Sequence, residues 1–253
     1  MDILNELNLF YLATSGEKGS IGKSLLGKDL YYFCVRKTAC PVVIVQYAIH
    51  AREYITTYLA LKHIKDYMKN GAKGTVYFIP ALNPDGISVS LSGKPLYKSN
   101  ARGVDLNVNF DARWGLGETN TVIKGDQNCI GEYPFSEPET RAIRDFTLKI
   151  RPDITVSYHS KGEEIYWYFY QDGVRRAKDV KIARAVSEIT GYPLKLTPNS
   201  AGGYKDWCIE KLKIPSLTIE VGDDGLCHPL KKTDLPAIYQ KNKDVIKLIT
   251  EIV

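Results

Sequence analysis

The 253-residue sequence lacks the features that mark membrane-spanning, fibrous or multi-domain chains. No apolar run approaches the ~20 residues that a membrane-spanning helix needs. No Pro/Gly/Ser-rich linker, low-complexity tract or internal repeat divides the chain, so we expect one domain with a sizeable core. The N-terminus has no basic leader followed by an apolar segment and a small-residue cleavage site, and the expected location is therefore cytoplasmic.

Charge of one sign is also scarce, because 34 basic residues stand against 29 acidic ones, for a formal net charge of +5. No basic patch accompanies a nucleic-acid recognition module, so nothing predicts a nucleic-acid or membrane partner. The five cysteines are an odd number without close metal-ligand spacing, which favours reduced thiols. The oligomeric state stays open.

What the sequence does contain is an alternation of strand and helix patterns. Apolar, β-branched runs predict strands, and amphipathic segments with capping signals predict helices. Strands are expected at 30–36, 41–48, 75–82, 153–160, 164–170 and 215–222, and helices at about 53–69, 136–150, 173–190, 203–212 and from 234. Residues 1–25 are taken as a short lead-in, "NPDG" as a turn and 87–136 as loop-rich, with Ser136 as a helix cap. The pattern is α/β, a sheet with helices on both faces.

Polar side chains stand at the carboxyl ends of four of these expected strands. They are His50, Asn83, His159 and Glu220. In α/β sheets the ligand site lies beyond the carboxyl ends of the strands. We therefore expect these side chains to surround one site.

Histidine is rare, with only four in the chain, and two of them end apolar strands. His63 lies mid-helix and His228 precedes a proline in a loop, so both are expected to be structural. Catalytic zinc takes three protein ligands and keeps one position open. His50, Glu53 one turn later and the distant His159 would form such a set. Taken alone, the His-x-x-Glu pattern is weak, and a polar strand end before a helix explains it better.

The accompanying motifs decide between these readings. "HARE", "NPDG", "GVDLNVNF", "YHS", "GGYKDW" and "IEVG" occur in this order. From about residue 25 onward the chain resembles the M14 family of zinc carboxypeptidases, a resemblance that implies a single-domain α/β/α sandwich with a mixed sheet. It implies that His50, Glu53 and His159 bind one zinc ion and that Asp105 orients a ligand histidine. It also implies that Glu220 moves the proton of a zinc-activated water.

The same resemblance suggests substrate contacts. Arg52 and Ser160 would touch the peptide backbone, and Asn107 would hold a substrate carboxylate. The family arginine that polarises the scissile carbonyl has no unique counterpart. Three basic residues could supply it or contact the substrate nearby, namely Lys98, Arg102 and Arg113.

Three positions depart from the family pattern. Val108 stands where an arginine clamps the substrate carboxylate, and an apolar side chain offers no bidentate fork. Pro198 stands where the family has a mobile-loop tyrosine, although Tyr204 could occupy nearby space. Lys205 stands at the pocket floor and predicts an anionic substrate group, unless it points to solvent.

The combination "NARGVDLN", "DARWG" and "GGYKDW" is most similar to a bacterial branch that cleaves the γ-D-glutamyl–diamino acid bond of cell-wall peptides. The expected partner is therefore an acidic muropeptide. Two alternatives stay open: a metallocarboxypeptidase or amidohydrolase that removes acidic residues or acyl groups, and a non-enzymatic binding protein that keeps the fold. The four intact residues His50, Glu53, His159 and Glu220 argue against the second.

Overall fold

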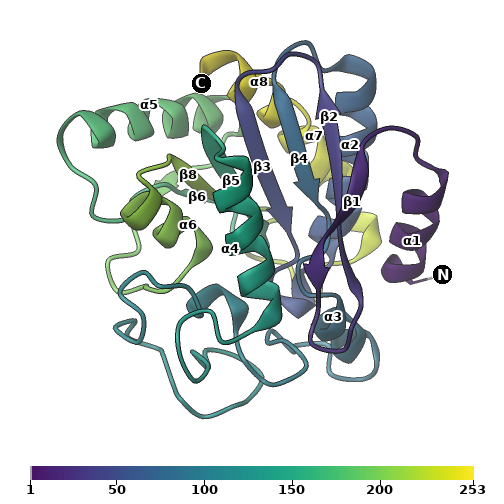
Figure 1. Ribbon diagram of the computed structural model, residues 1–253, viewed down its shortest axis with the longest axis vertical. Coiled ribbons are helices and arrows are strands. Elements are labelled where there is room, and N and C mark those ends of the chain that lie inside the picture. The colour runs from purple at the N-terminus through teal and green to yellow at the C-terminus, as the bar shows by residue number, and fades with distance from the viewer. Residues whose placement is uncertain (1) are drawn as a thin grey trace.

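A computed structural model describes residues 2–253 and shows an eight-stranded mixed sheet between two layers of helices (Figure 1). The sheet order is β1-β2-β4-β3-β5-β8-β6-β7. In chain order the strands are β1 (Lys18–Lys23), β2 (Asp29–Arg36), β3 (Val42–Tyr47), β4 (Thr75–Ile79), β5 (Ile154–His159), β6 (Glu164–Tyr166), β7 (Leu194–Lys195) and β8 (Ser216–Glu220). The α/β class and the sheet covered on both faces are confirmed.

Helices cover the two faces unequally. The α-helices are α1 (Ile3–Ala13), α2 (Ile55–Asn70), α3 (Pro84–Leu91), α4 (Pro138–Ile150), α5 (Gly173–Thr190), α6 (Tyr204–Trp207), α7 (Leu235–Asn242) and α8 (Val245–Ile252). The shorter helical turns are η1 (Ala51–Glu53), η2 (Leu106–Val108), η3 (Cys208–Leu212) and η4 (Lys232–Asp234). One core lies under α1, α2, α5, α7 and α8, and a second lies under α4 and α6 (Figure 1). No helix among residues 2–253 is long and apolar enough to cross a membrane.

The central strands β4, β3, β5 and β8 are parallel neighbours. Both faces of β3 are covered, which explains its continuous apolar sequence: Val43 and Val45 point into one core and Ile44 into the other. In α2, burial recurs at Ile55, Leu59 and other positions on one helical face, so the helix packs on the sheet along a stripe. This arrangement holds the carboxyl ends of four strands at one edge.

The structure corrects three expectations near the ends of elements. Residues 1–25 were expected to form a lead-in, but within them α1 buries Ile3 and Leu7 in the core and β1 extends the sheet. "NPDG" is the first turn of α3, because the Asn83 side chain accepts a hydrogen bond from Gly86 N at 2.9 Å. The cap of α4 is Glu137 rather than Ser136, whose hydroxyl accepts from Asn109 Nδ2.

Two further elements are shorter than the apolar pattern predicts. The aromatic strand expected over 164–170 ends at Tyr166, and Tyr170 has a positive φ of 56° that leaves the strand conformation. The C-terminal helix is divided into α7 and α8 at Lys243 and Asp244. In both places tertiary packing overrides a local pattern.

Candidate active site

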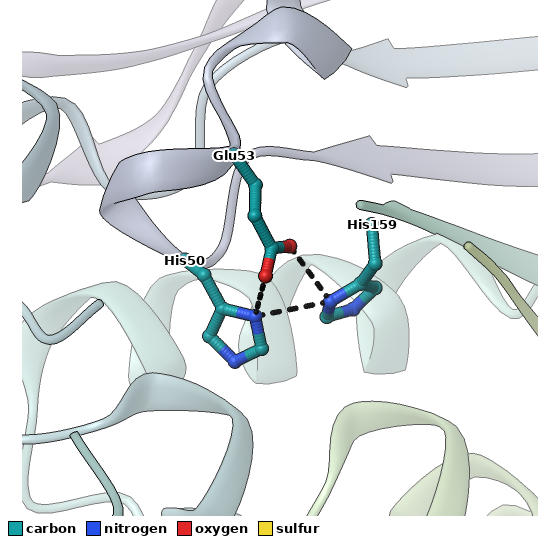
Figure 2. A group of neighbouring side chains, drawn as sticks. All are labelled: His50, Glu53 and His159. Carbon is teal, nitrogen blue, oxygen red and sulfur yellow. Dashed lines mark hydrogen bonds and ion pairs between the residues drawn. The ribbon is translucent and has the colours of Figure 1, made fainter. Parts of the chain in front are cut away.

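Three side chains from two strand ends converge on one point (Figure 2). His50 follows β3 and caps η1, and Glu53 closes that single turn, with its backbone N–H donating to His50 O at 3.2 Å. His159 is the last residue of β5. Glu53 Oε1 lies 2.8 Å from His50 Nδ1, and Glu53 Oε2 lies 3.1 Å from His159 Nδ1. Because one helical turn separates His50 from Glu53, both side chains face His159.

The donor set fits a zinc ion. The two Nδ1 atoms are 3.1 Å apart, and all three residues are buried. Zinc–ligand bonds of about 2.0–2.2 Å in a tetrahedron separate the donor atoms by roughly 3.3–3.6 Å. The donor atoms here are 2.8–3.1 Å apart, so a small outward shift would fit the ion. The two imidazole nitrogens and the carboxylate point their lone pairs at one another. A cation bound between them would relieve this repulsion. The expected ligands are thus brought together in a set typical of catalytic zinc.

Asp105 supports this set from behind His50. Its Oδ1 lies 3.2 Å from His50 Nε2, so it can fix the ring with Nδ1 facing the site. The backbone N–H groups of Asn107 and Asn128 each donate to the Asp105 carboxylate at 3.1 Å. Burial opposes ionisation of Asp105, but Lys98 and His50 outweigh it and hold its pKa well below the usual range. Asp105 is therefore a fixed anion.

Of the three basic candidates, the structure brings Lys98 to the site. Lys98 Nζ lies 3.1 Å from Asp105 Oδ2, the carboxylate that also contacts His50. The Arg102 guanidinium instead faces Glu137, with Nε 3.7 Å from Oε2. Arg113 stacks over the Tyr170 ring and pairs with Glu210. Of these three basic residues, only Lys98 contacts a residue that itself contacts an expected metal ligand, namely Asp105.

Glu220 ends β8 directly beside His159, its backbone partner in the parallel ladder. Its Oε2 has no hydrogen-bond partner among the described residues. Burial raises the pKa of the Glu220 carboxyl to about 8, with a further contribution from the Glu53 charge. A bound dication would favour the ionised form. Glu220 is thus free to exchange a proton with a group at the site.

Ser160 and Arg52 flank the ligands with unused polar atoms. The Ser160 backbone N–H donates to Glu53 Oε2 at 3.3 Å, while its hydroxyl has no partner among residues 2–253. Arg52 makes one long bond, from Nη1 to Leu96 O at 3.5 Å, and its Nε is unpartnered within the described chain. Both positions agree with an expected role in contacting substrate.

Tyr204 does not reach the site, contrary to expectation. Its side chain is fully buried, and its hydroxyl lies 2.8 Å from Thr147 Oγ1 on α4. The Tyr204 backbone N–H donates to Asn107 Oδ1 at 3.2 Å, which ties Asn107 to the start of α6. The ring packs against Phe110 because α6 presents this face to the second core.

Lys205 neither points to solvent nor carries a free charge. It is 6% exposed, and Nζ lies 2.5 Å from Asp206 Oδ1 and 3.0 Å from Tyr168 O. A lysine that is paired with a buried aspartate presents no net charge to a ligand. Lys205 therefore does not support the prediction that the pocket floor binds an anionic substrate group.

This pairing gives a stability prediction. Lys205→Met should lower the free energy of unfolding by about 3–5 kcal/mol, because it leaves the buried Asp206 carboxylate without its counter-ion. Denaturant unfolding measures the loss. Lys211→Met is the matched control, since the Lys211 side chain is 43% exposed on the next turn and should change stability by less than ~0.5 kcal/mol. A loss below ~1 kcal/mol for Lys205→Met would contradict a buried ion pair.

His228, which was expected to be structural, is not one of the three converging donors. Burial lowers the pKa of its ring to about 4, and its Nδ1 has no hydrogen-bond partner among residues 2–253.

Comparison with known proteins agrees with this geometry. The chain is 28% identical over 230 residues to γ-D-glutamyl-L-diamino acid endopeptidase 1 of Lysinibacillus sphaericus, covering 77% of this chain and 57% of that protein. It superposes on bovine thrombin-activatable fibrinolysis inhibitor, in complex with tick carboxypeptidase inhibitor, with a TM-score of 0.85 at 20% identity, covering 99% and 96% of the two chains. For murein-tripeptide amidase MpaA from Escherichia coli O157 the TM-score is 0.66 at 21% identity, with 95% and 93% covered. These two structures share the fold.

The model of the zinc carboxypeptidase family matches residues 15–245, nearly the whole chain. The matched range contains His50, Glu53, His159 and Glu220, which the fold gathers at one edge of the sheet. The resemblance seen in the ordered motifs is confirmed, and the chain belongs to the M14 zinc carboxypeptidase family.

Proposed function

We propose that the protein is a zinc metallopeptidase that hydrolyses the γ-D-glutamyl–diamino acid bond of cell-wall peptides. The observation that carries the hydrolytic part is the convergence of His50, Glu53 and His159 with Glu220 beside them. The similarity to the Lysinibacillus sphaericus endopeptidase supports the substrate class. The chain spans 57% of that relative's length, so the relative has residues that this sequence does not match.

The chain's own residues then have distinct roles. Zinc, when bound, supplies a Lewis acid that polarises the scissile carbonyl and lowers the pKa of a water molecule. Glu220 accepts the proton of the attacking water and delivers it to the leaving amine. Lys98, held in place by Asp105, has further N–H donors and donates a hydrogen bond to the carbonyl oxygen as that oxygen becomes negative. Asn107, fixed by the α6 backbone, contacts the residue on the amine side of the bond.

Val108 gives this proposal a substrate test. Without the family's arginine, a simple blocked dipeptide loses an ionic partner for its single carboxylate, which typically costs several kcal/mol. A cell-wall peptide offers further carboxylates that other residues can bind. We expect at least ~100-fold higher kcat/KM on L-Ala-γ-D-Glu-diaminopimelate than on a hippuryl-type dipeptide, equivalent to ~2.7 kcal/mol.

The measurement is steady-state kinetics with products identified by mass. Val108→Arg should narrow the ratio by improving the dipeptide. Equal turnover of both substrates by the wild type would reject the specificity and favour an ordinary metallocarboxypeptidase, while the zinc-peptidase assignment would stand.

A further inference from the structure

Asn83 shares the carboxyl edge of the sheet with the expected metal ligands but is not one of the three converging donors. It follows β4, caps the start of α3 and is fully buried. In Figure 1, α3 lies beyond the carboxyl ends of β3 and β4. The contacts of this side chain therefore connect α3 with its neighbours at the edge where the site lies.

The amide group of Asn83 is fully hydrogen-bonded inside the protein. Nδ2 donates to Ile49 O at 3.0 Å and to Ser99 O at 3.1 Å, and Oδ1 accepts from Gly86 N at 2.9 Å. A flipped amide would turn its oxygen toward two carbonyl oxygens, so the surroundings fix this orientation. The two bonds from Nδ2, called the Asn83 bridge below, join segments that are 50 residues apart in the chain.

Both segments that the Asn83 bridge joins carry a residue of the site. Ile49 directly precedes the expected ligand His50, and Ser99 directly follows Lys98. The backbone N–H of Ala51 donates to Lys98 O at 3.0 Å, so the two segments also bond each other. The bridge therefore helps to set the position of His50 relative to Lys98.

The turn that precedes His50 needs such support. Ala48 has a φ of 50°, a left-handed conformation that a residue with a Cβ keeps only where its surroundings hold it. Its N–H donates to Thr56 Oγ1 at 2.9 Å, and its carbonyl accepts from Asn83 N at 3.1 Å. The Asn83 bridge fixes the next carbonyl along, that of Ile49. The backbone and the side chain of Asn83 thus hold two successive peptide groups before the ligand.

The glycine of the "NPDG" motif makes room for the Asn83 bridge. A Cβ on Gly86 would lie 2.4 Å from Ser99 O and 2.6 Å from both Nδ2 and Oδ1 of Asn83. Real Cβ atoms do not come that close to a backbone oxygen, so only glycine lets the Ser99 backbone approach the amide. Within the motif, Asn83 supplies the hydrogen bonds and Gly86 supplies the clearance.

We propose that Asn83 is a positioning residue that fixes His50 for zinc binding and Lys98 for its contact with the scissile carbonyl. This inference rests on the proposed function, which gives those two residues their roles. Asn83 acts through the backbone next to each of them and touches neither the metal nor the substrate. Groups that orient metal ligands from outside typically change metal affinity or activity by about 10- to 100-fold. Loss of the bridge should therefore affect zinc binding and turnover together.

Asn83→Ser tests the bridge while it keeps a helix cap, because serine caps a helix about as well as asparagine but has no amide N–H. Competition with a chromogenic chelator should show a zinc Kd about 10- to 100-fold above that of the wild type. At saturating zinc, kcat on L-Ala-γ-D-Glu-diaminopimelate should fall about 10- to 100-fold. KM should change less than about threefold, because Lys98 acts on an oxygen that becomes negative only in the transition state.

Asn242→Ser is the matched control for lost stability. Asn242 is also fully buried, and its Nδ2 donates to Tyr192 Oη at 3.1 Å and to Ile238 O at 2.9 Å, in segments other than those of His50 and Lys98. Its Tm should fall because buried hydrogen bonds are lost, while zinc Kd and kcat stay within about twofold of the wild type. If Asn83→Ser does not fold, Asn83→Asp gives the same readouts, since it keeps the size and the cap but turns an oxygen toward both carbonyls.

Three results would overturn the positioning role. Zinc Kd and kcat near the wild-type values in Asn83→Ser, with only Tm lowered, would leave Asn83 as a helix cap. A change in zinc Kd or kcat alone would contradict one amide that serves both residues. Equal effects in Asn242→Ser would assign the loss to stability. If the wild type binds zinc but cleaves no peptide, the proposed bond specificity fails, and a zinc Kd raised in Asn83→Ser and not in Asn242→Ser still supports the bridge.

Discussion

Glu220→Gln should lower kcat by roughly 10²–10⁴ while one zinc ion per chain stays bound. A positioned general acid–base group contributes a factor of this size, and glutamine keeps the shape of glutamate but cannot accept a proton. Glu220 is not one of the three converging metal donors, and its Oε2 makes no hydrogen bond within residues 2–253. The substitution therefore removes a proton carrier without removing a ligand.

Glu164→Gln is the matched control, because Glu164 lies opposite Glu220 in the antiparallel ladder between β6 and β8. Its carboxylate accepts from Tyr166 and pairs with Lys195, and it is not one of the three metal donors. We expect its kcat to stay within a few-fold of the wild type. If Glu220→Gln retains activity within a few-fold as well, proton transfer belongs to another group.

The second large effect concerns the metal. His159→Ala should abolish stoichiometric zinc binding and activity together, because catalytic zinc needs three protein ligands and only His50 and Glu53 would be left. The fold should survive, since His159 is the last residue of β5 and the rest of the strand stays paired with β3 and β8. Elemental analysis measures the zinc content of the purified protein.

Thermal unfolding provides an independent readout of the same ligand set. Zinc at 1,000 times its Kd stabilises the folded wild type by about 4 kcal/mol, so a chelator should lower its Tm and leave that of His159→Ala unchanged. His228→Gln should keep its zinc, because His228 is outside the donor set. Full zinc content in His159→Ala would require a different ligand.

The sequence by itself determined the class of the fold and predicted the three side chains that could hold the metal. Apolar strand patterns placed His50, His159 and Glu220 at strand ends, and parallel neighbours bring such ends to one edge of a sheet. The His50–Glu53 pair depends on a single helical turn, which is a local property of the chain. The ordered motifs then identified the family, because the residues of each motif lie close together in the chain and can be read directly from the sequence.

Only the tertiary structure decided which of the other polar residues face the site. Lys98 was one of three basic candidates, and it is selected because Asp105 holds it. Tyr204 turns inward to Thr147, 57 residues away in the chain.

The direction of Lys205 was likewise beyond sequence reasoning. Its side chain is buried, paired with Asp206 and bonded to Tyr168 O, 37 residues away in the chain. The physical reason is that the direction and net charge of a buried side chain depend on partners that packing brings together, and the local pattern of residues does not encode those partners.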